Sequence, residues 1–431
     1  MNLDLSPINM SCDSKANKGQ IKRLACYFQD YAWGKKGPTS MVYELLDENI
    51  KNKVKQDSNF AELWMGTHPN LPSMVQDEST LKSLKELILD SPDINLGKPI
   101  RENFGDDLPF LFKVLSVNKA LSIQAHPDKT LAEILHTKRP DIYKDGNHKP
   151  EMAVALTQFE ALCGFRPLSE IYEFIKALPE FQELLERNGD KVDFNVTDEL
   201  VLRKIFHNLM TSPEELVKQQ LGKLFQRLEA KPDILRPDIS ELAFRLHNQY
   251  PGDVGIFCSF MLNFVVLSPG QAIFLGANEP HAYLKGDCIE CMATSDNVIR
   301  AGLTPKFKDV EVLTSMLTYN CDPIAEKIFS GVPMPGSPYS LLYDPPIPEF
   351  SVISIRIPDP GLSQECKISN GPGILLVTSA PPSSLLVGND EQYMLSKGNV
   401  FFIPPNTKFS MTFGHVPSVS PLQAFFAYCS L

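Results

Sequence analysis

The chain has 431 residues, enough for two or three hydrophobic cores. Its 43% hydrophobic and 22% charged residues are typical of a globular protein, and no run of about 18 apolar residues exists to span a membrane. The net charge of −11 disfavours nucleic acid and anionic membranes as partners, so an anionic substrate would need a locally basic pocket.

The first 20 residues have neither a basic start nor an apolar segment, and we expect a disordered extension rather than a secretory signal. The nine cysteines are scattered and odd in number, which favours free thiols in a reducing cytoplasm. Cys288 and Cys291 stand three apart in a strand-like segment. Their side chains should face opposite sides of the strand, which argues against the two thiols binding one metal ion.

Strand-like runs with a few helices fill residues 21–165, including a helical pattern over 81–88. Residues 166–250 change to a helical period, which predicts an inserted α-helical domain. Its clearest signals are a stripe of apolar residues, a capping box at Ser212-Pro213-Glu214-Glu215 with proline at the first helical position, and a second stripe after that box. The two stripes comprise Leu168, Ile171, Tyr172, Ile175 and Leu178, then Val217, Leu221, Leu224, Phe225 and Leu228.

Strands return from residue 251, together with an internal repeat. Residues 270–281 align with 398–409, each with a glycine turn, an apolar strand and a second turn, which is the pattern of jelly-roll barrels. In the second copy Phe409 replaces His281. The first copy also resembles the second motif of the cupin superfamily. We therefore expect a mainly β protein with two jelly-roll barrels in tandem, which the resemblance implies are of cupin type: a catalytic domain from 21–165 and 251–320, and a degenerate barrel without metal ligands over 321–431.

Four candidate metal ligands lie in three strand-like segments: Gln124 and His126, Glu151, and His281. Alternation along a strand places Gln124 and His126 on one face with Ser122, while their neighbours form an apolar face. Two imidazoles, a carboxylate and an amide oxygen suit zinc and leave room for an exchangeable ligand. The pattern favours a catalytic site over a structural one.

The segments around these ligands resemble the type I mannose-6-phosphate isomerases of the cupin superfamily. The resemblance covers most of residues 24–315 and is looser beyond. It is carried by Q-D-Y-A-W-G at 29–34, F-A-E-L-W-M-G-T-H-P at 60–69, F-K-V-L-S-V-N-K-A-L-S-I-Q-A-H-P-D at 112–128, N-H-K-P-E-M-A-V-A-L at 147–156, and the long segment at 269–306 that contains N-E-P-H-A-Y and D-N-V-I-R-A-G.

The resemblance implies a zinc-dependent aldose–ketose isomerase, with one Zn²⁺ per chain, that interconverts mannose 6-phosphate and fructose 6-phosphate through an enediol. This reaction would feed GDP-mannose and glycan precursors. The expected partner is a small sugar phosphate, and the expected state is a monomer. Two alternatives remain: a cupin isomerase of another phosphosugar, and a non-catalytic sugar-phosphate-binding protein.

The resemblance also implies roles for further residues. Arg300 is expected to be catalytic, with Lys113, Lys149 and Glu290 as acid–base or substrate-contact groups. The sequence does not identify which of them is the base. Our candidates for binding the substrate are Ser122, Tyr283 and Lys306. We expect Glu62 and Trp33 to be architectural, and the remaining histidines, including His68, to be ordinary.

Overall fold

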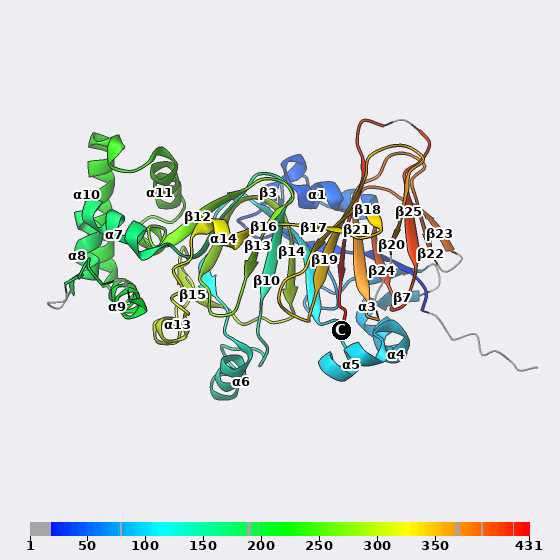
Figure 1. Cartoon of the computed structure of the whole chain (residues 1–431), viewed down its shortest axis with the longest axis horizontal. Helices are drawn as coiled ribbons and strands as arrows, with labels where there is room; N and C mark the ends of the chain where they lie inside the picture. The colour runs from blue at the N-terminus through cyan, green and yellow to red at the C-terminus, as the bar shows by residue number, and fades with distance from the viewer. Residues whose placement is uncertain are drawn as a thin grey trace, which may run out of the picture.

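The computed structural model describes residues 19–431 apart from 78, 79, 188–190, 197, 367–369, 389–390 and 417. The extension predicted for residues 1–20 therefore lies almost wholly outside the described part. The fold is mostly β-sheet with an α-helical insertion, as the sequence predicts. The helices of the insertion lie at one end of the long axis, one large sheet lies in the middle, and the C-terminal strands lie at the other end (Figure 1).

The central sheet has 11 strands and supplies the candidate site. In chain order its strands are β2 (Tyr27–Gln29), β5 (Glu62–Met65), β8 (Phe110–Val117), β9 (Ile123–Ala125), β10 (Glu151–Ala155), β11 (Phe159–Phe165), β12 (Leu262–Leu267), β13 (Gln271–Leu275), β14 (His281–Ala293), β15 (Ile299–Gly302) and β16 (Ile328–Ser330). The longest, β14, pairs with β8, β9, β10 and β11 and is buried along nearly all of its length. Cys288 and Cys291 in β14 face two different cores, as predicted.

A second sheet of nine strands lies at the C-terminal end. Its strands, in spatial order, are β17 (Val332–Met334), β18 (Ser337–Tyr343), β19 (Ser351–Ile357), β26 (Leu422–Tyr428), β21 (Gly373–Ser379), β24 (Val400–Ile403), β1 (Lys22–Ala25), β6 (Met74–Asp77) and β7 (Thr80–Ser83). Two smaller sheets contain β20 (Ser363–Cys366), β25 (Phe409–Thr412), β22 (Leu385–Gly388) and β23 (Glu391–Met394), and β3 (Lys35–Lys36) with β4 (Asn59–Phe60).

These sheets cross the domain boundaries drawn from sequence. Strands β1, β6 and β7 belong to the segment assigned to the catalytic domain, but they extend the sheet of the C-terminal strands. Conversely, β16 comes from the C-terminal segment and pairs with β13 of the central sheet. Short strands of this kind carry no sequence signal for which sheet they join.

In the described residues of the insertion the α-helices are α7 (Leu168–Ala177), α8 (Pro179–Leu185), α9 (Glu199–Met210), α10 (Glu214–Ala230) and α11 (Pro237–Gln249). Both predicted apolar stripes are buried. The predicted capping box is wrong, because Pro213 is the N-cap of α10 and Ser212 Oγ instead donates to Asn208 O at 2.9 Å, closing the end of α9.

The other helices are short: α1 (Met41–Leu45), α2 (Glu48–Lys51), α3 (Leu84–Asp90), α4 (Pro92–Asn95), α5 (Lys98–Phe104), α6 (Lys129–Lys138), α12 (Gly255–Cys258), α13 (Val310–Met316) and α14 (Ile324–Lys327). The helical pattern expected over 81–88 is only partly correct, since Leu81 lies in β7 and Ser83 caps α3 with a full capping box. Within the described residues, no helix combines the length and apolarity needed to cross a membrane.

The two copies of the internal repeat share unusual backbone conformations. Gly270 and Gly398 have φ values of +87° and +85°, and Asn278 and Asn406 have φ values of +62° and +56°. A strand follows each glycine, and His281 and Phe409 each begin the next strand. Phe409 is buried in an apolar core, as predicted for a position without a metal.

Candidate active site

Three side chains from neighbouring strand ends form a compact cluster. Glu151 begins β10, His281 begins β14, and His126 directly follows β9. The Nε2 atoms of His126 and His281 lie 3.4 and 3.3 Å from the two carboxylate oxygens of Glu151. Among the described residues, these three form the group of His, Cys, Asp or Glu side chains close enough to hold one metal ion. All three are buried.

Hydrogen bonds fix how both imidazoles are oriented. His126 Nδ1 lies 2.6 Å from Asn297 O and His281 Nδ1 lies 3.0 Å from Glu279 O. Because a carbonyl only accepts, each Nδ1 is the protonated nitrogen and each Nε2 presents its lone pair to the cluster. Within the described residues, neither Nε2 has a partner other than the Glu151 carboxylate. Buried polar atoms left in this state are explained by a ligand that they would bind together.

The protonation states also suit a cation. Burial lowers the pKa of His126 to about 4, which keeps the ring neutral near pH 7. Burial opposes ionisation of Glu151, but His126 and Lys149 hold its pKa well below the usual range. Neutral imidazoles and an ionised carboxylate are the forms that bind metals.

The fourth predicted ligand, Gln124, lies in the same ladder. In the antiparallel pairing it is opposite His281 on one side and Arg300 on the other. Its side chain lines the adjoining cavity, and Ser122 Oγ donates to its Oε1 at 3.3 Å. Ligation by Gln124 remains a prediction.

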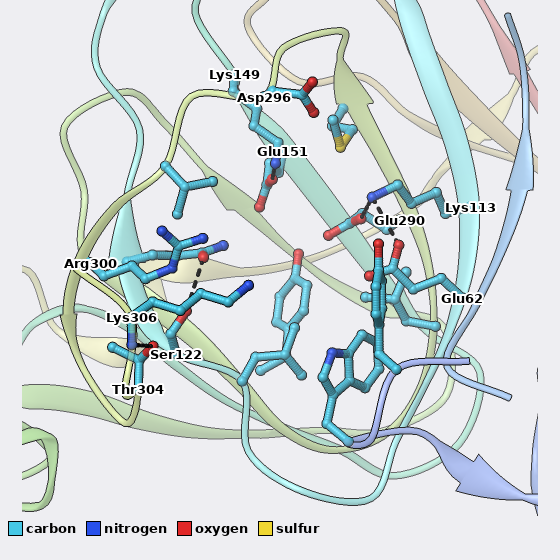
Figure 2. A pocket seen from close by; sticks show the side chains of 18 of the residues that line it. Glu62, Lys113, Ser122, Lys149, Glu151, Glu290, Asp296, Arg300, Thr304 and Lys306 are labelled. Atoms are coloured by element: carbon cyan, nitrogen blue, oxygen red, sulfur yellow. Dashed lines mark hydrogen bonds and ion pairs between the residues drawn. The ribbon is translucent and has the colours of Figure 1, made fainter. Parts of the chain in front are cut away.

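A cavity of about 530 Å³ opens beside the cluster and is lined by all the predicted catalytic and substrate-binding residues. On one side of the cavity, Lys113 Nζ lies 3.3 Å from carboxylate oxygens of both Glu62 and Glu290 (Figure 2). Trp64 Nε1 donates to Glu62 at 2.6 Å, and its ring lies below the Lys113 ammonium. The Lys113 charge on this side is therefore paired with carboxylates.

The opposite side carries cations without such partners. Figure 2 shows Arg300, Lys306 and Ser122 together there, away from the Lys113 group. Within the described part of the chain, neither Arg300 nor Lys306 makes an ion pair with a carboxylate. Lys149 stands apart from both groups, with its Nζ 3.3 Å from Glu151 Oε1. The cavity thus has the candidate metal site at Glu151, one side on which Lys113 is paired with two carboxylates, and an opposite side whose cations are unpaired within the described residues.

Burial affects the titrating groups in opposite directions. It would lower the pKa of Lys113, but Glu62 and Glu290 raise that pKa above its ordinary value, so Lys113 stays protonated. Burial raises the pKa of Glu290, with Lys113 opposing. Burial also raises the pKa of Tyr283 well above its usual value, which keeps the hydroxyl a neutral donor.

Some residues that line the cavity had no role in the site expected from the sequence. Glu62 is not merely architectural, because it holds Lys113. His68 is buried at the cavity wall, with its Nε2 3.4 Å from Asp296 Oδ1. A signal for Glu62 existed: a carboxylate inside the apolar run F-A-E-L-W-M needs a buried partner. Nothing in the sequence singled out Tyr250, which reaches the cavity from the end of the helical insertion.

Comparisons with known proteins agree with this geometry. Residues 21–168 match the family "Phosphomannose isomerase type I, catalytic domain", and residues 179–262 match its "helical insertion domain". The mannose-6-phosphate isomerase of Bos taurus is 44% identical over 90% of this chain and 94% of its own length. The human enzyme is 42% identical over the same shares.

Solved structures show the same likeness. A mutant phosphomannose isomerase from Salmonella typhimurium superposes with a TM-score of 0.82 at 29% identity, covering 96% of this chain and 100% of the other. A mannose 6-phosphate isomerase solved with zinc and yttrium gives a TM-score of 0.81 at 28% identity, with the same coverage.

Proposed function

The chain belongs to the type I phosphomannose isomerase family and is an isomerase, and from that premise we propose that it interconverts mannose 6-phosphate and fructose 6-phosphate with a bound zinc ion. One observation carries the proposal: three buried ligand atoms without other partners in the described residues lie together, and one of their residues, Glu151, lines a cavity that has one positive wall. The metal would occupy one end of a sugar phosphate's site and the phosphate the other. The non-catalytic alternative is dropped, because the curated relatives are enzymes.

The metal would be held by His126, Glu151 and His281, with Gln124 as the fourth protein ligand. Bound there, zinc supplies positive charge for the oxygens on C1 and C2 of the sugar. Only Glu151 among the four carries a formal charge, so the loaded site would keep a net positive charge. That sign favours the negative charge that develops as an aldose becomes a ketose.

The reaction moves a proton between C1 and C2 through an enediol. We assign Arg300 to the charge that develops on this intermediate, because its guanidinium has free forked donors facing the cavity. Lys113 is a poor base because two carboxylates hold its proton. Proton transfer therefore falls to Lys149 or Glu290, and Lys113 orients Glu290.

The positive wall is the proposed site of the 6-phosphate. Lys306 contributes charge without a competing carboxylate in the described residues, and Ser122 contributes a hydroxyl. Tyr283 would donate its hydroxyl to the sugar. A lysine ammonium and a serine hydroxyl are ordinary phosphate partners.

A coupled isomerase assay before and after treatment with a chelator tests the function. We expect fructose 6-phosphate from mannose 6-phosphate, loss of activity in the chelator, and recovery with zinc. Conversion of glucose 6-phosphate alone would instead favour an isomerase of another phosphosugar. Activity unaffected by complete removal of metal would contradict the zinc proposal.

The ligand set has its own test. Replacing Glu151 with Ala should lower zinc content and abolish activity while leaving a folded protein, because strand pairing rather than the ion builds the sheet. Metal analysis and circular dichroism measure these outcomes. Near-stoichiometric zinc in an inactive variant would remove Glu151 from the ligand set.

We further propose a monomer that acts in the cytoplasm and supplies GDP-mannose and glycan precursors. Within the described part of the chain the cysteines form no disulfide bond, which suits a reducing compartment. The matched conformations of the repeat support two tandem cupin-type barrels with the helical insertion at 166–250. Light scattering and cell fractionation test the assembly and the location.

A further inference from the structure

A second cavity, of about 640 Å³, lies beside the catalytic one. The helical insertion and the segment after β15 form its walls. Five residues line both cavities, so the two share a wall: Lys119, Tyr250, Thr304, Pro305 and Lys306. The family resemblance and the proposed isomerase chemistry use only the first cavity.

Lysines dominate the charged groups of the second cavity. Lys119 and Lys306 lie on the shared wall, while Lys218 and Lys308 line only the second cavity. Across the described ranges, carboxylate ion pairs are absent for Lys119, Lys306 and Lys308, and Lys218 pairs with the exposed Glu215 at 2.9 Å. Within those ranges, three lysines without a carboxylate ion pair in one cavity are unexpected in a chain with a net charge of −11.

The acidic groups of the cavity do not cancel this charge. Its acids are Glu214, at the start of α10, and Asp253. The Asp253 carboxylate is already engaged, because it accepts backbone N–H bonds from Gly255 and Leu303 at 2.7 Å and from Thr304 at 3.1 Å. These bonds hold the cavity wall but leave the charge of Asp253 in place, so four lysines face two carboxylates and the lining keeps a net positive charge.

Two of the lysines pack against neighbouring residues, although the side chain of Lys218 is 51% exposed. The Lys119 ammonium lies 4.1 Å from the centre of the Tyr250 ring, and Tyr250 itself donates its hydroxyl to Ala120 O at 2.5 Å. The stem of Lys218 packs on Gly252, where a Cβ would come within 2.9 Å of Lys218 Cγ. Ordered cations lose less side-chain freedom when an anion binds.

We propose that the second cavity is a binding site for a phosphate-bearing small molecule, and that its occupation weakens binding of the substrate. The antagonism follows from the shared wall. An anion in the second cavity would interact with Lys119 and Lys306, which also line the catalytic cavity and would then be less available to the substrate. The site therefore makes the enzyme sensitive to phosphorylated molecules other than its substrate.

Inhibition by inorganic phosphate can show which of the two cavities binds the phosphate. The variant K218Q/K308Q removes two cations that line only the second cavity. We expect its inhibition constant for phosphate to rise at least about threefold, while KM for mannose 6-phosphate stays within about twofold, as loss of one or two charge contacts at one site implies. The control K223Q/K231Q removes equal charge from α10 and its C-cap, outside both cavities, and should change neither constant.

Two outcomes would overturn the proposal. If KM and the inhibition constant rise together, the lysines act through a diffuse field and not as a site. If neither changes relative to the control, phosphate binds only in the catalytic cavity. Equilibrium dialysis of labelled phosphate, which needs no turnover, should show reduced binding in K218Q/K308Q alone. That result would stand even if the protein failed to isomerise mannose 6-phosphate.

Discussion

Arg300 is the residue that best separates catalysis from binding. If it stabilises charge that develops only during the reaction, Arg300→Ala should lower kcat by about 10²–10³ and change KM much less. Arg300→Lys should recover little, because the forked donors are lost. Steady-state kinetics at confirmed zinc content check this. A rise in KM at constant kcat would move Arg300 to phosphate binding.

Glu290 should make stability depend on pH. Because burial raises its pKa, the folded protein keeps this proton at pH values where the unfolded chain, with its ordinary value of 4.5, has lost it. The stabilisation is complete below that value and is lost as pH rises through the folded pKa. Glu290→Gln cannot lose the proton, so its stability relative to wild type should increase with pH.

Urea unfolding of both metal-free proteins from about pH 4.5 upward measures this difference. A difference that does not change with pH would show that Glu290 titrates normally in the folded chain.

For single residues, the sequence predicted that His126, Glu151 and His281 lie together, but it did not predict the charge pairing. His126 and Glu151 were recognisable from their motifs and from the alternation of faces along a strand. The pairing of Lys113 with Glu62 was not, because they come together only when β5 pairs with β8. Register between strands far apart in sequence is set by the whole sheet.

Among the structural elements, the repeat offers a matched pair of glycines. Gly270 and Gly398 both require a left-handed conformation, which costs an L-residue about 1–2 kcal/mol. A Cβ on Gly398 would also lie 2.5 Å from Leu45 O, whereas at Gly270 the nearest atom is Tyr343 Oη at 3.9 Å. Gly398→Ala should therefore lower the free energy of unfolding by about 1–3 kcal/mol more than Gly270→Ala. Equal losses in denaturant titrations would contradict this packing.

The end of the helical insertion should influence substrate binding. Tyr250 and Gln249 hold the backbone of Ala120, whose N–H donates to Gln249 Oε1 at 3.0 Å. The held segment carries Ser122 into the cavity. Tyr250→Phe should cost about 1 kcal/mol of stability and raise KM roughly three- to tenfold, because an ordered segment loses a hydrogen bond.

Tyr172→Phe is the control for this variant. It removes a similar 2.5 Å bond to Val196 O inside the insertion, so stability should fall while KM stays constant. If both variants leave KM unchanged, the insertion does not position the cavity wall.

The sequence predicted that these helices exist, but not what they touch. Periodicity reports which face of a helix is buried, as for α7 and α10, and not which loop lies against its end. The second cavity was equally invisible, since Lys119, Lys218 and Lys308 meet only in the folded chain.

For the whole molecule, the sequence indicated the class of fold and the order of the β-rich and helical segments. The domain boundaries drawn from it were too simple, because strands of each β-rich segment join the sheet of the other. The apolar strands of both β-rich segments are alike in composition, so nothing local assigns β1 to one sheet or the other. The sheet that β1 joins is set by its pairing with β24 and β6, and that pairing can form only when the chain through β24 is present.

That pairing has a consequence for how the protein is made. Leu24 lies opposite Val400 in the ladder between β1 and β24. At about 5–20 residues per second, a ribosome needs roughly 20–75 s to produce the partner strand after the first has emerged. During that interval the edge of β1 that later pairs with β24 stays unpaired, and an unpaired strand edge is a template for aggregation. Nascent chains should therefore depend on chaperones, and a nonsense mutation before β24 would leave this edge of β1 permanently unpaired.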